Sequence, residues 1–168
     1  TEEGIEYEAD QRHAEIICRD VGLKADSNAV STPGIQTPVI NSKEENMSET
    51  MYRAVVARGN YLSQDRPDVQ YTTKELSRTM SKPDEDSWHD VKRLGRYLLG
   101  EGRLVQRYEY QDLPGYVDVW VDTGFSGCRK TRKSTSGGLM MWGKGCVKTW
   151  SSTQDNVAPS SGEAEFME

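Results

Sequence analysis

Apolar residues in the middle of the chain recur with the spacing of an α-helix. Between Ser48 and Gly100 they lie three or four residues apart, in blocks separated by proline-containing breaks at 65–68 and 81–84. Proline lacks a backbone N–H and restricts the residue before it, so each break is expected to interrupt a helix. The pattern predicts helices over about 48–62, about 69–80, and from about Pro83 to the glycines at 100 and 102.

After Gly102 the apolar spacing changes to two, which is the period of a β-strand. Two alternating stretches flank the turn-like sequence 112–115, and two more flank Gly143-Lys144-Gly145. The pattern predicts two hairpins, with strands at 105–110, 116–122, 139–142 and 146–150. Alternation also places Trp142 and Trp150 in the core. A last helix is expected to begin at Ser161 or Gly162 and to cover 163–168.

The first 47 residues are mostly polar. Ala14, Ile17 and Val21 follow helical spacing and predict a short helix over about 9–21, whereas the stretch 26–46 is typical of a linker. The sequence therefore predicts an α+β fold. It has an acidic N-terminal segment and linker (1–47), a helical region (48–104) and a strand-rich region (105–168).

Charge is unevenly distributed along the chain. The net charge is −6, but the first 26 residues alone carry eight acidic and three basic side chains. The stretch 125–135 has no acid and contains four cations, which are Arg129, Lys130, Arg132 and Lys133. This stretch has two interpretations, a phosphate-binding patch or an ordinary solvated loop.

Several classes of protein are not favoured by the composition. No apolar run has membrane-spanning length and no signal peptide opens the chain, so an intracellular protein without a membrane partner is expected. The three cysteines are widely spaced and form no metal-ligand pattern with the two histidines, which argues against disulfides and zinc.

Two aspartates lie in the strand predicted at 116–122. Asp118 and Asp122 are four residues apart, or roughly 13 Å at about 3.3 Å per residue. They cannot both bind one pair of metal ions, which lie about 4 Å apart. Asp122, at the end of the predicted strand, is the better catalytic candidate. The triplet Asp122-Thr123-Gly124 by itself also resembles an aspartic protease, in which the aspartate pairs with a second one to activate water.

The remaining motifs resemble the RNase H of copia-type LTR retrotransposons. That family has an ordered series D-x-D-W-A-G, R-K-S-T-S-G, W-x-S-K/T-x-Q and S-x-x-E-A-E-Y. The corresponding stretches here are 122–127, 132–137, 150–154 and 160–166, of which 150–154 is one residue shorter than its pattern. Upstream, 52–56, 61–62, 66–69 and 88–98 resemble the segment that follows the reverse transcriptase palm. The resemblance covers about 45–168 and extends more loosely over Tyr7 to Pro38.

The resemblance implies a function for the parent domain and roles for particular residues. Asp122 matches the first catalytic aspartate, and Glu165 matches the catalytic glutamate of the first helix. Both would ligate Mg²⁺, with Mn²⁺ as an alternative, during hydrolysis of the RNA strand of an RNA–DNA hybrid. The basic stretch would contact the hybrid. The fold implied is a reverse transcriptase connection region followed by an incomplete RNase H-like sheet of three antiparallel strands and the start of the first helix.

The chain also departs from the family pattern. Gly124 and Phe125 replace the second aspartate and the tryptophan of D-x-D-W, and the palm motif Tyr-x-Asp-Asp is absent. The later RNase H aspartates would lie beyond Glu168. We therefore expect a truncated piece of a Pol polyprotein that acts with the remainder of it, in a cytoplasmic particle or the nucleus, and that is inactive alone. A non-catalytic nucleic-acid-binding remnant and an aspartic protease are the alternatives.

Overall fold

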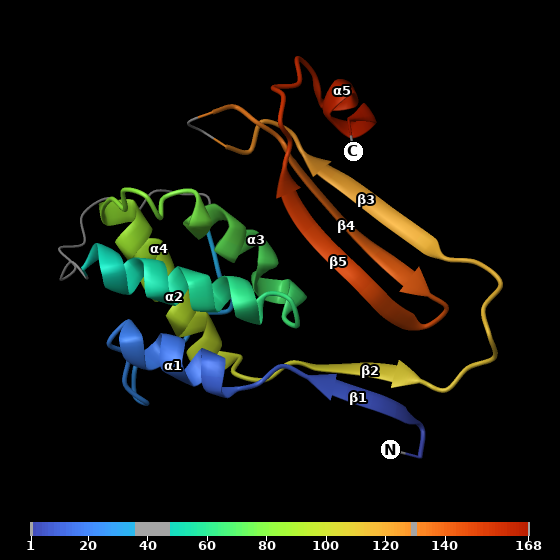
Figure 1. Cartoon of the computed structure of the whole chain (residues 1–168), viewed down its shortest axis with the longest axis horizontal. Helices are drawn as coiled ribbons and strands as arrows, with labels where there is room; N and C mark the ends of the chain where they lie inside the picture. Colours follow the sequence, from blue (N-terminus) through green and yellow to red (C-terminus); the bar gives the residue numbers. More distant parts are fainter. Residues whose placement is uncertain (1, 36–47, 129–130, 168) are drawn as a thin grey trace. The chain divides into compact units, whose positions relative to one another are not determined.

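The computed structural model describes residues 2–35, 48–128 and 131–167. They form a mixed α+β structure (Figure 1). Its elements, in chain order, are β1 (Gly4–Glu8), α1 (Arg12–Asp20), α2 (Glu49–Leu62), α3 (Pro67–Ser77), α4 (Glu85–Gly100), β2 (Val105–Glu109), β3 (Asp118–Gly124), β4 (Thr135–Trp142), β5 (Gly145–Thr153) and α5 (Ser161–Phe166). The chain divides into a helical unit, Glu8–Val105, and a strand-rich unit, Thr1–Tyr7 with Gln106–Glu168.

The helices predicted within residues 8–105 are present in the helical unit, as α1, α2, α3 and α4. Ser48 caps α2 by accepting a hydrogen bond from the N–H of Met51, as the sequence predicts. Asp84 and Ser87 form a reciprocal capping box at the start of α4. Pro67 occupies the first turn of α3, where its missing N–H removes no helical bond. In the described ranges no helix combines the length and the apolar character needed to cross a membrane.

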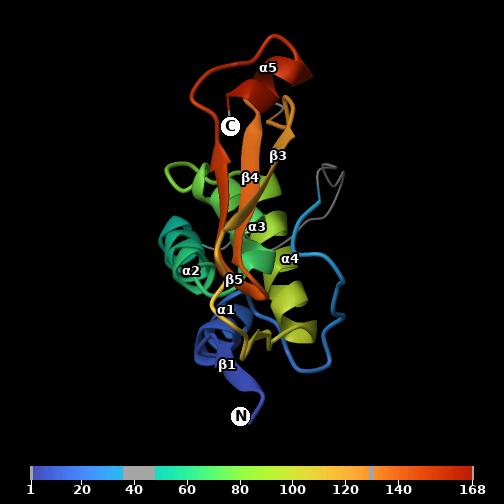
Figure 2. The same cartoon turned by 90° about the vertical axis from the view of Figure 1, so that its right-hand side faces the viewer.

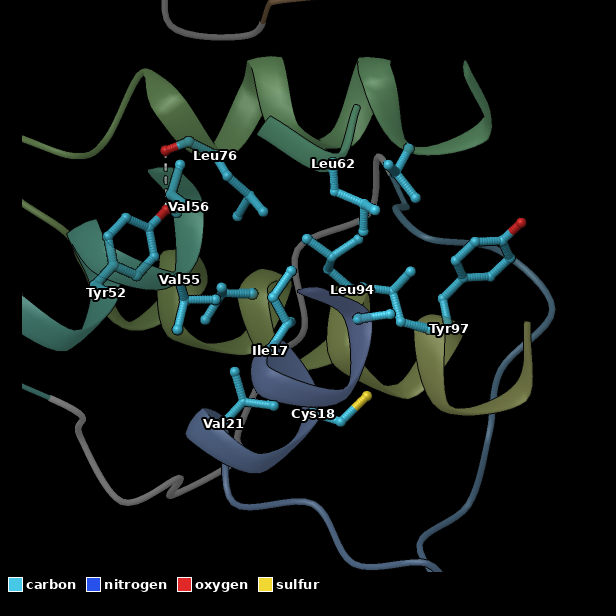
Figure 3. Close-up of a cluster of buried hydrophobic side chains, with 14 of the residues drawn as sticks. Ile17, Cys18, Val21, Tyr52, Val55, Val56, Leu62, Leu76, Leu94 and Tyr97 are labelled. Carbon is cyan, nitrogen blue, oxygen red and sulfur yellow. Dashed lines mark hydrogen bonds between the residues drawn. The ribbon is translucent and has the colours of Figure 1, made fainter. Parts of the chain in front are cut away.

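One apolar core holds α1 to α4 together (Figure 3). Tyr52 lies at its edge, fully buried, and donates its hydroxyl proton to the carbonyl of Leu76 over 3.0 Å. The main side chains of the core are Ala14, Ile17, Tyr52, Val55, Val56, Leu62, Val69, Leu76, Trp88, Val91, Leu94 and Leu98. Burial of this set is the main stabilising contribution in the unit.

Glycine allows α1 and α4 to approach closely. A Cβ atom on Gly95 would lie 2.6 Å from Cγ2 of Val21, which is closer than side-chain carbons pack. The close approach of the two helices also brings the thiol of Cys18 to 3.3 Å from the carbonyl oxygen of Gly95. Any larger residue at position 95 would therefore push α1 away from α4.

In the strand-rich unit, β3, β4 and β5 form an antiparallel sheet with β4 in the middle (Figures 1 and 2). Asp122 pairs with Gly137 and Gly124 with Thr135, while Thr135 pairs in turn with Thr153. The second predicted hairpin, β4–β5, is confirmed, and each of its strands is longer than the sequence predicts. The helix predicted after it is α5.

The first predicted hairpin is wrong. Residues 105–110 were expected to pair with 116–122, but β2 pairs with β1. The sequence did not predict β1, because the start of the chain is mostly polar. The segment after β2 does not close a tight turn, because it binds the β4–β5 turn instead. Gln111 donates to the carbonyl of Trp142 over 2.9 Å, and the indole of Trp142 donates to the carbonyl of Pro114 over 3.2 Å.

Trp142 was also predicted to lie in the core, and this prediction is wrong because Trp142 is 40% exposed. Trp150 is half-buried because its ring covers Gly138, where a Cβ would collide with it. Trp120 and Val121 occupy opposite faces of β3, and both are more than half exposed. What is buried in this unit is small and largely polar, namely Thr123, Ser134, Ser136, Gln154, Ala158 and Ala164.

Candidate active site

The pairing of the sheet brings the candidate residues to one end of it. The end of β3, the start of β4 and the end of β5 lie beside one another, because Gly124 pairs with Thr135 and Thr135 with Thr153. The loop between β3 and β4 and the segment leading to α5 both leave the sheet there (Figure 1). Asp122, Arg132 with Lys133, and Glu165 therefore belong to the same end of the sheet.

Asp122 lies within β3, two residues before its end, and its side chain is exposed. The next residue, Thr123, is buried, and its hydroxyl lies 3.5 Å from the carbonyl oxygen of Ala164 in α5. Successive side chains of a strand point to opposite faces. The side chain of Asp122 therefore projects from the face opposite to the one on which Thr123 meets α5. Asp118 shares the face of Asp122 but begins the strand.

Glu165 lies on α5, a six-residue helix capped by Ser160, whose hydroxyl accepts from the N–H of Glu163. Ala164 is fully buried, whereas Glu163 and Glu165 on either side of it are exposed. The structure thus joins the neighbours of the two candidate acids, Thr123 and Ala164. In the described ranges, no three acidic, histidine or cysteine side chains gather closely enough to hold a metal ion.

A buried amide connects the elements around these two acids. Gln154, immediately after β5, donates through Nε2 to the carbonyl of Ala164 over 2.7 Å and to the hydroxyl of Ser136 over 3.0 Å. Its backbone N–H donates to the carbonyl of Ser134 over 2.9 Å. Ser136 is the cross-strand partner of Thr123. Side chains from four separate sequence motifs therefore meet in one buried cluster.

Sequence reasoning did not single out Thr123 or Gln154 as site residues. The sequence did carry one signal for them. Both are polar residues that lie inside the motifs that resemble the family, Thr123 in 122–127 and Gln154 in 150–154. Polar side chains in such positions are buried only when they are hydrogen-bonded, and that bonding depends on the pairing of the strands.

The basic stretch is partly described. Arg129 and Lys130 lie outside the described residues. Arg132 is exposed and Lys133 is half-exposed. The loop that carries them is closed by hydrogen bonds from Cys128 N–H to the carbonyl of Lys133 (3.2 Å) and from Arg132 N–H to the carbonyl of Cys128 (2.7 Å).

This loop adopts a defined backbone conformation. Ser126 and Arg132 both have positive φ values, 54° and 58°, which residues other than glycine rarely adopt. The N–H of Ser126 donates to the hydroxyl of the fully buried Ser134, which anchors the loop to the sheet. Arg132 and Lys133 therefore lie at the end of the sheet where Asp122 lies, next to the hydrogen bond that joins Ser126 to Ser134.

Comparison with known proteins gives relatives along most of the chain. It is 29% identical over 154 residues to the retrovirus-related Pol polyprotein from transposon RE2 of Arabidopsis thaliana, a match that covers 86% of this chain and 10% of that protein. It is 27% identical over 158 residues to an uncharacterized mitochondrial protein of the same plant, covering 92% of this chain and 64% of that protein. No protein-family profile and no solved structure matches the chain.

A further relative is Secreted RxLR effector protein 161 of Plasmopara viticola, which is 36% identical over 105 residues, or 61% of this chain and 71% of that protein. The chain spans about a tenth of the length of the Pol polyproteins that it matches. These matches agree with the resemblance that the ordered motifs indicate. Over most of its length the chain is therefore related to a segment of the retrovirus-related Pol polyproteins of copia-type transposons.

Proposed function

We propose that the strand-rich unit is the first part of an RNase H-like domain, which in the complete protein hydrolyses the RNA strand of RNA–DNA hybrids. The observation that carries this proposal is the order of its parts. An antiparallel three-stranded sheet with Asp122 in its first strand is followed by a helix that bears Glu165. The neighbours of both acids share the hydrogen bonds of one buried cluster.

Divalent metal is part of this proposal, and the residues described here do not form a complete site for it. Mg²⁺ prefers oxygen ligands in an octahedral arrangement, and Asp122 and Glu165 would supply two carboxylates. The side chain of Asp122 leaves β3 on the face opposite to the one on which Thr123 meets α5. When bound, Mg²⁺ or Mn²⁺ would activate water and stabilise the leaving oxygen.

The proposed substrate is bound in part by the basic loop. Arg132 and Lys133 have no acidic residue near them in sequence and lie at the same end of the sheet as Asp122. Cations on a fixed loop attract phosphates without reading sequence, as a nuclease for hybrids requires. Arg129 and Lys130 extend the same run of charge in the sequence.

The helical unit is proposed to be the connection that follows the reverse transcriptase palm in Pol polyproteins. The Arg66-Pro67-Asp68-Val69 motif begins α3 in this unit, and the motif around Trp88 to Leu98 forms most of α4. The remainder of the Pol polyprotein is then the structural partner of both units.

The proposal is tested with a chimera in which this chain is followed by the part of the RE2 polyprotein that succeeds the matched segment. We expect Mg²⁺-dependent cleavage of the RNA strand of a labelled hybrid. Asp122→Asn and Glu165→Gln should reduce cleavage to background. Asp118→Asn and Glu163→Gln, which change an acid on the same strand and the same helix, should not.

Two other functions give different results in this assay. Hybrid binding with no cleavage in any buffer would support the non-catalytic remnant, a possibility favoured by Gly124 at the position of the family's second aspartate. Peptide cleavage that survives EDTA and is lost in Asp122→Asn would support the aspartic protease. If Asp118→Asn abolishes hybrid cleavage and Asp122→Asn does not, the assignment of the catalytic strand position is wrong.

A further inference from the structure

We infer that Gln154 is a positioning residue that fixes Glu165 relative to Asp122, an inference that deepens and rests on the proposed function. Helix α5 has six residues, too few to be stable without tertiary contacts. Its position therefore depends on what its buried side contacts. That side consists of Ala164, which is fully buried, and of the hydrogen bonds received by the Ala164 carbonyl.

The hydrogen bonds of Gln154 determine which way its amide faces. The carbonyl oxygen of Ala164 can only accept, so the atom of Gln154 that lies 2.7 Å from it must be the nitrogen. The same nitrogen donates its second proton to the hydroxyl of Ser136 in β4. One amide group thus holds the helix residue next to Glu165 and the strand residue that pairs with Thr123, the neighbour of Asp122.

The oxygen atom of the Gln154 amide also indicates that the nitrogen atom is what holds this side chain in place. Gln154 is 8% exposed, and within the described part of the chain its buried Oε1 atom has no hydrogen-bond partner. A buried acceptor without a partner is unfavourable for folding. The amide is therefore held in place by its donor end, and donation to the Ala164 carbonyl is the interaction that links the sheet to α5.

Two substitutions separate this role from simple packing. Gln154→Met keeps a similar volume but donates nothing. Gln154→Glu keeps the shape, and its ionised carboxylate would repel the Ala164 carbonyl, whereas its protonated form can donate again. Burial raises the pKa of a carboxyl, so protonation of this variant is expected within an accessible pH range. Asp155→Asn, at the exposed neighbouring position, is the matched control.

The experiment is NMR on the labelled 168-residue chain, following cross-relaxation between the side-chain protons of Thr123 and the protons of Ala164. We expect this contact in the wild type and in Asp155→Asn, and its loss in Gln154→Met. In Gln154→Glu it should be lost at about pH 8 and regained toward about pH 5, whereas the wild-type contact should not change over that range. Contacts between β3 and β4 report that the sheet is intact in each variant.

Persistence of the Thr123–Ala164 contact in Gln154→Met and in Gln154→Glu at about pH 8 would overturn the inference. So would loss of the contact in Gln154→Glu without recovery on acidification, since that result indicates packing alone. Broadening of the Asp122 and Glu165 amide signals by Mn²⁺ is read separately. Its absence in a wild-type chain whose contact is intact counts against the proposed metal chemistry and leaves the role of Gln154 standing.

Discussion

The guanidinium of Arg66 and the carboxylate of Asp68 form a two-point ion pair, with Nη2 to Oδ2 at 2.6 Å and Nε to Oδ1 at 2.9 Å. Arg66 is 1% exposed, an unusual burial for arginine. Its remaining donors bond the carbonyls of Glu101 and Gly102 after α4, and the hydroxyl of Tyr97 donates to Asp68 over 2.8 Å. The motif at 66–69 therefore joins the start of α3 to the end of α4.

Because this pair is buried, removing one partner leaves an uncompensated charge. We expect Arg66→Ala or Asp68→Ala to lower the free energy of unfolding by about 3–5 kcal/mol. The measurement is urea denaturation followed by circular dichroism at a helical wavelength. The pair Arg12–Asp10 is the matched control, since it has the same sequence separation and a similar geometry but is exposed. Arg12→Ala should lower the free energy of unfolding far less, because exposed ion pairs contribute little to stability, and an equal loss in both pairs would contradict the role of burial.

The same network predicts a pH dependence. Burial and the hydrogen bond to Asp68 raise the pKa of Tyr97 to about 12. Because the folded chain favours the protonated phenol, this contribution is complete below the unfolded pKa of about 10 and is lost as the pH rises toward about 12. Unfolding measured across that interval should show the loss in the wild type and not in Tyr97→Phe. A wild-type curve that coincides in shape with that of Tyr97→Phe would contradict this prediction.

The carboxyl group of Asp68 predicts a second change in stability, at acid pH. Burial by itself would raise its pKa, but the hydrogen bonds from Arg66 and Tyr97 outweigh that effect and hold the pKa below its usual value. Its contribution to stability is therefore present above the unfolded pKa of about 3.9 and is lost as the pH falls through the lower, folded pKa. In acid titrations, Asp68→Asn should start less stable and lose less on acidification than the wild type.

The cysteines should differ in reactivity. Cys18 is buried between α1 and α4, and burial raises the pKa of its thiol, so both access and thiolate formation are reduced. Cys128 and Cys146 are only partly buried. Brief alkylation followed by peptide mass spectrometry should label Cys128 and Cys146 and leave Cys18 unmodified until the helical unit opens. Equal labelling of all three in the native chain would show that the α1–α4 contact is not maintained.

The basic loop should contribute electrostatic affinity for nucleic acid. We expect Arg132→Ala with Lys133→Ala to weaken binding of an RNA–DNA hybrid and to make its salt dependence shallower, because each phosphate contact adds about one counterion to the slope. Lys144→Ala is the control, since Lys144 is paired with Glu109 at the opposite end of the sheet. Binding isotherms at several salt concentrations give the slopes. If the double variant keeps the wild-type slope, these cations belong to a solvated loop.

The chain by itself is expected to be catalytically inactive. Its described residues offer only the two carboxylates proposed as metal ligands, and among those residues no three possible metal ligands gather closely enough to hold an ion. A metal ligand also needs packed neighbours that orient its side chain, and the side chain of Glu165 is exposed. Incubation of the purified chain with labelled hybrid and Mg²⁺ or Mn²⁺ should give no turnover. Multiple-turnover cleavage that EDTA abolishes, in material freed of host RNase H, would contradict this expectation.

Local sequence determined the helices of the unit at 8–105 and the likeness of most of the chain to Pol polyproteins. Ser48, Pro67 and Asp84 mark helix starts through bonds within a few residues, so their effect is readable from sequence. Family motifs are likewise local strings. The partner of β2 was not readable, because pairing of strands about a hundred residues apart depends on long-range contacts rather than on local alternation.

Tertiary structure also decided what lies inside the sheet's buried cluster and where the candidate acids point. Alternation alone places Trp142 in a core, yet burial requires a second layer over that face, and no alternating pattern supplies one. Sequence marked Asp122 and Glu165 as chemically suited, but the face from which Asp122 projects follows from which face Thr123 turns toward α5. That choice, and the role of Gln154, arise where β3, β4 and α5 meet, because hydrogen bonds between distant segments exist only once the chain has folded.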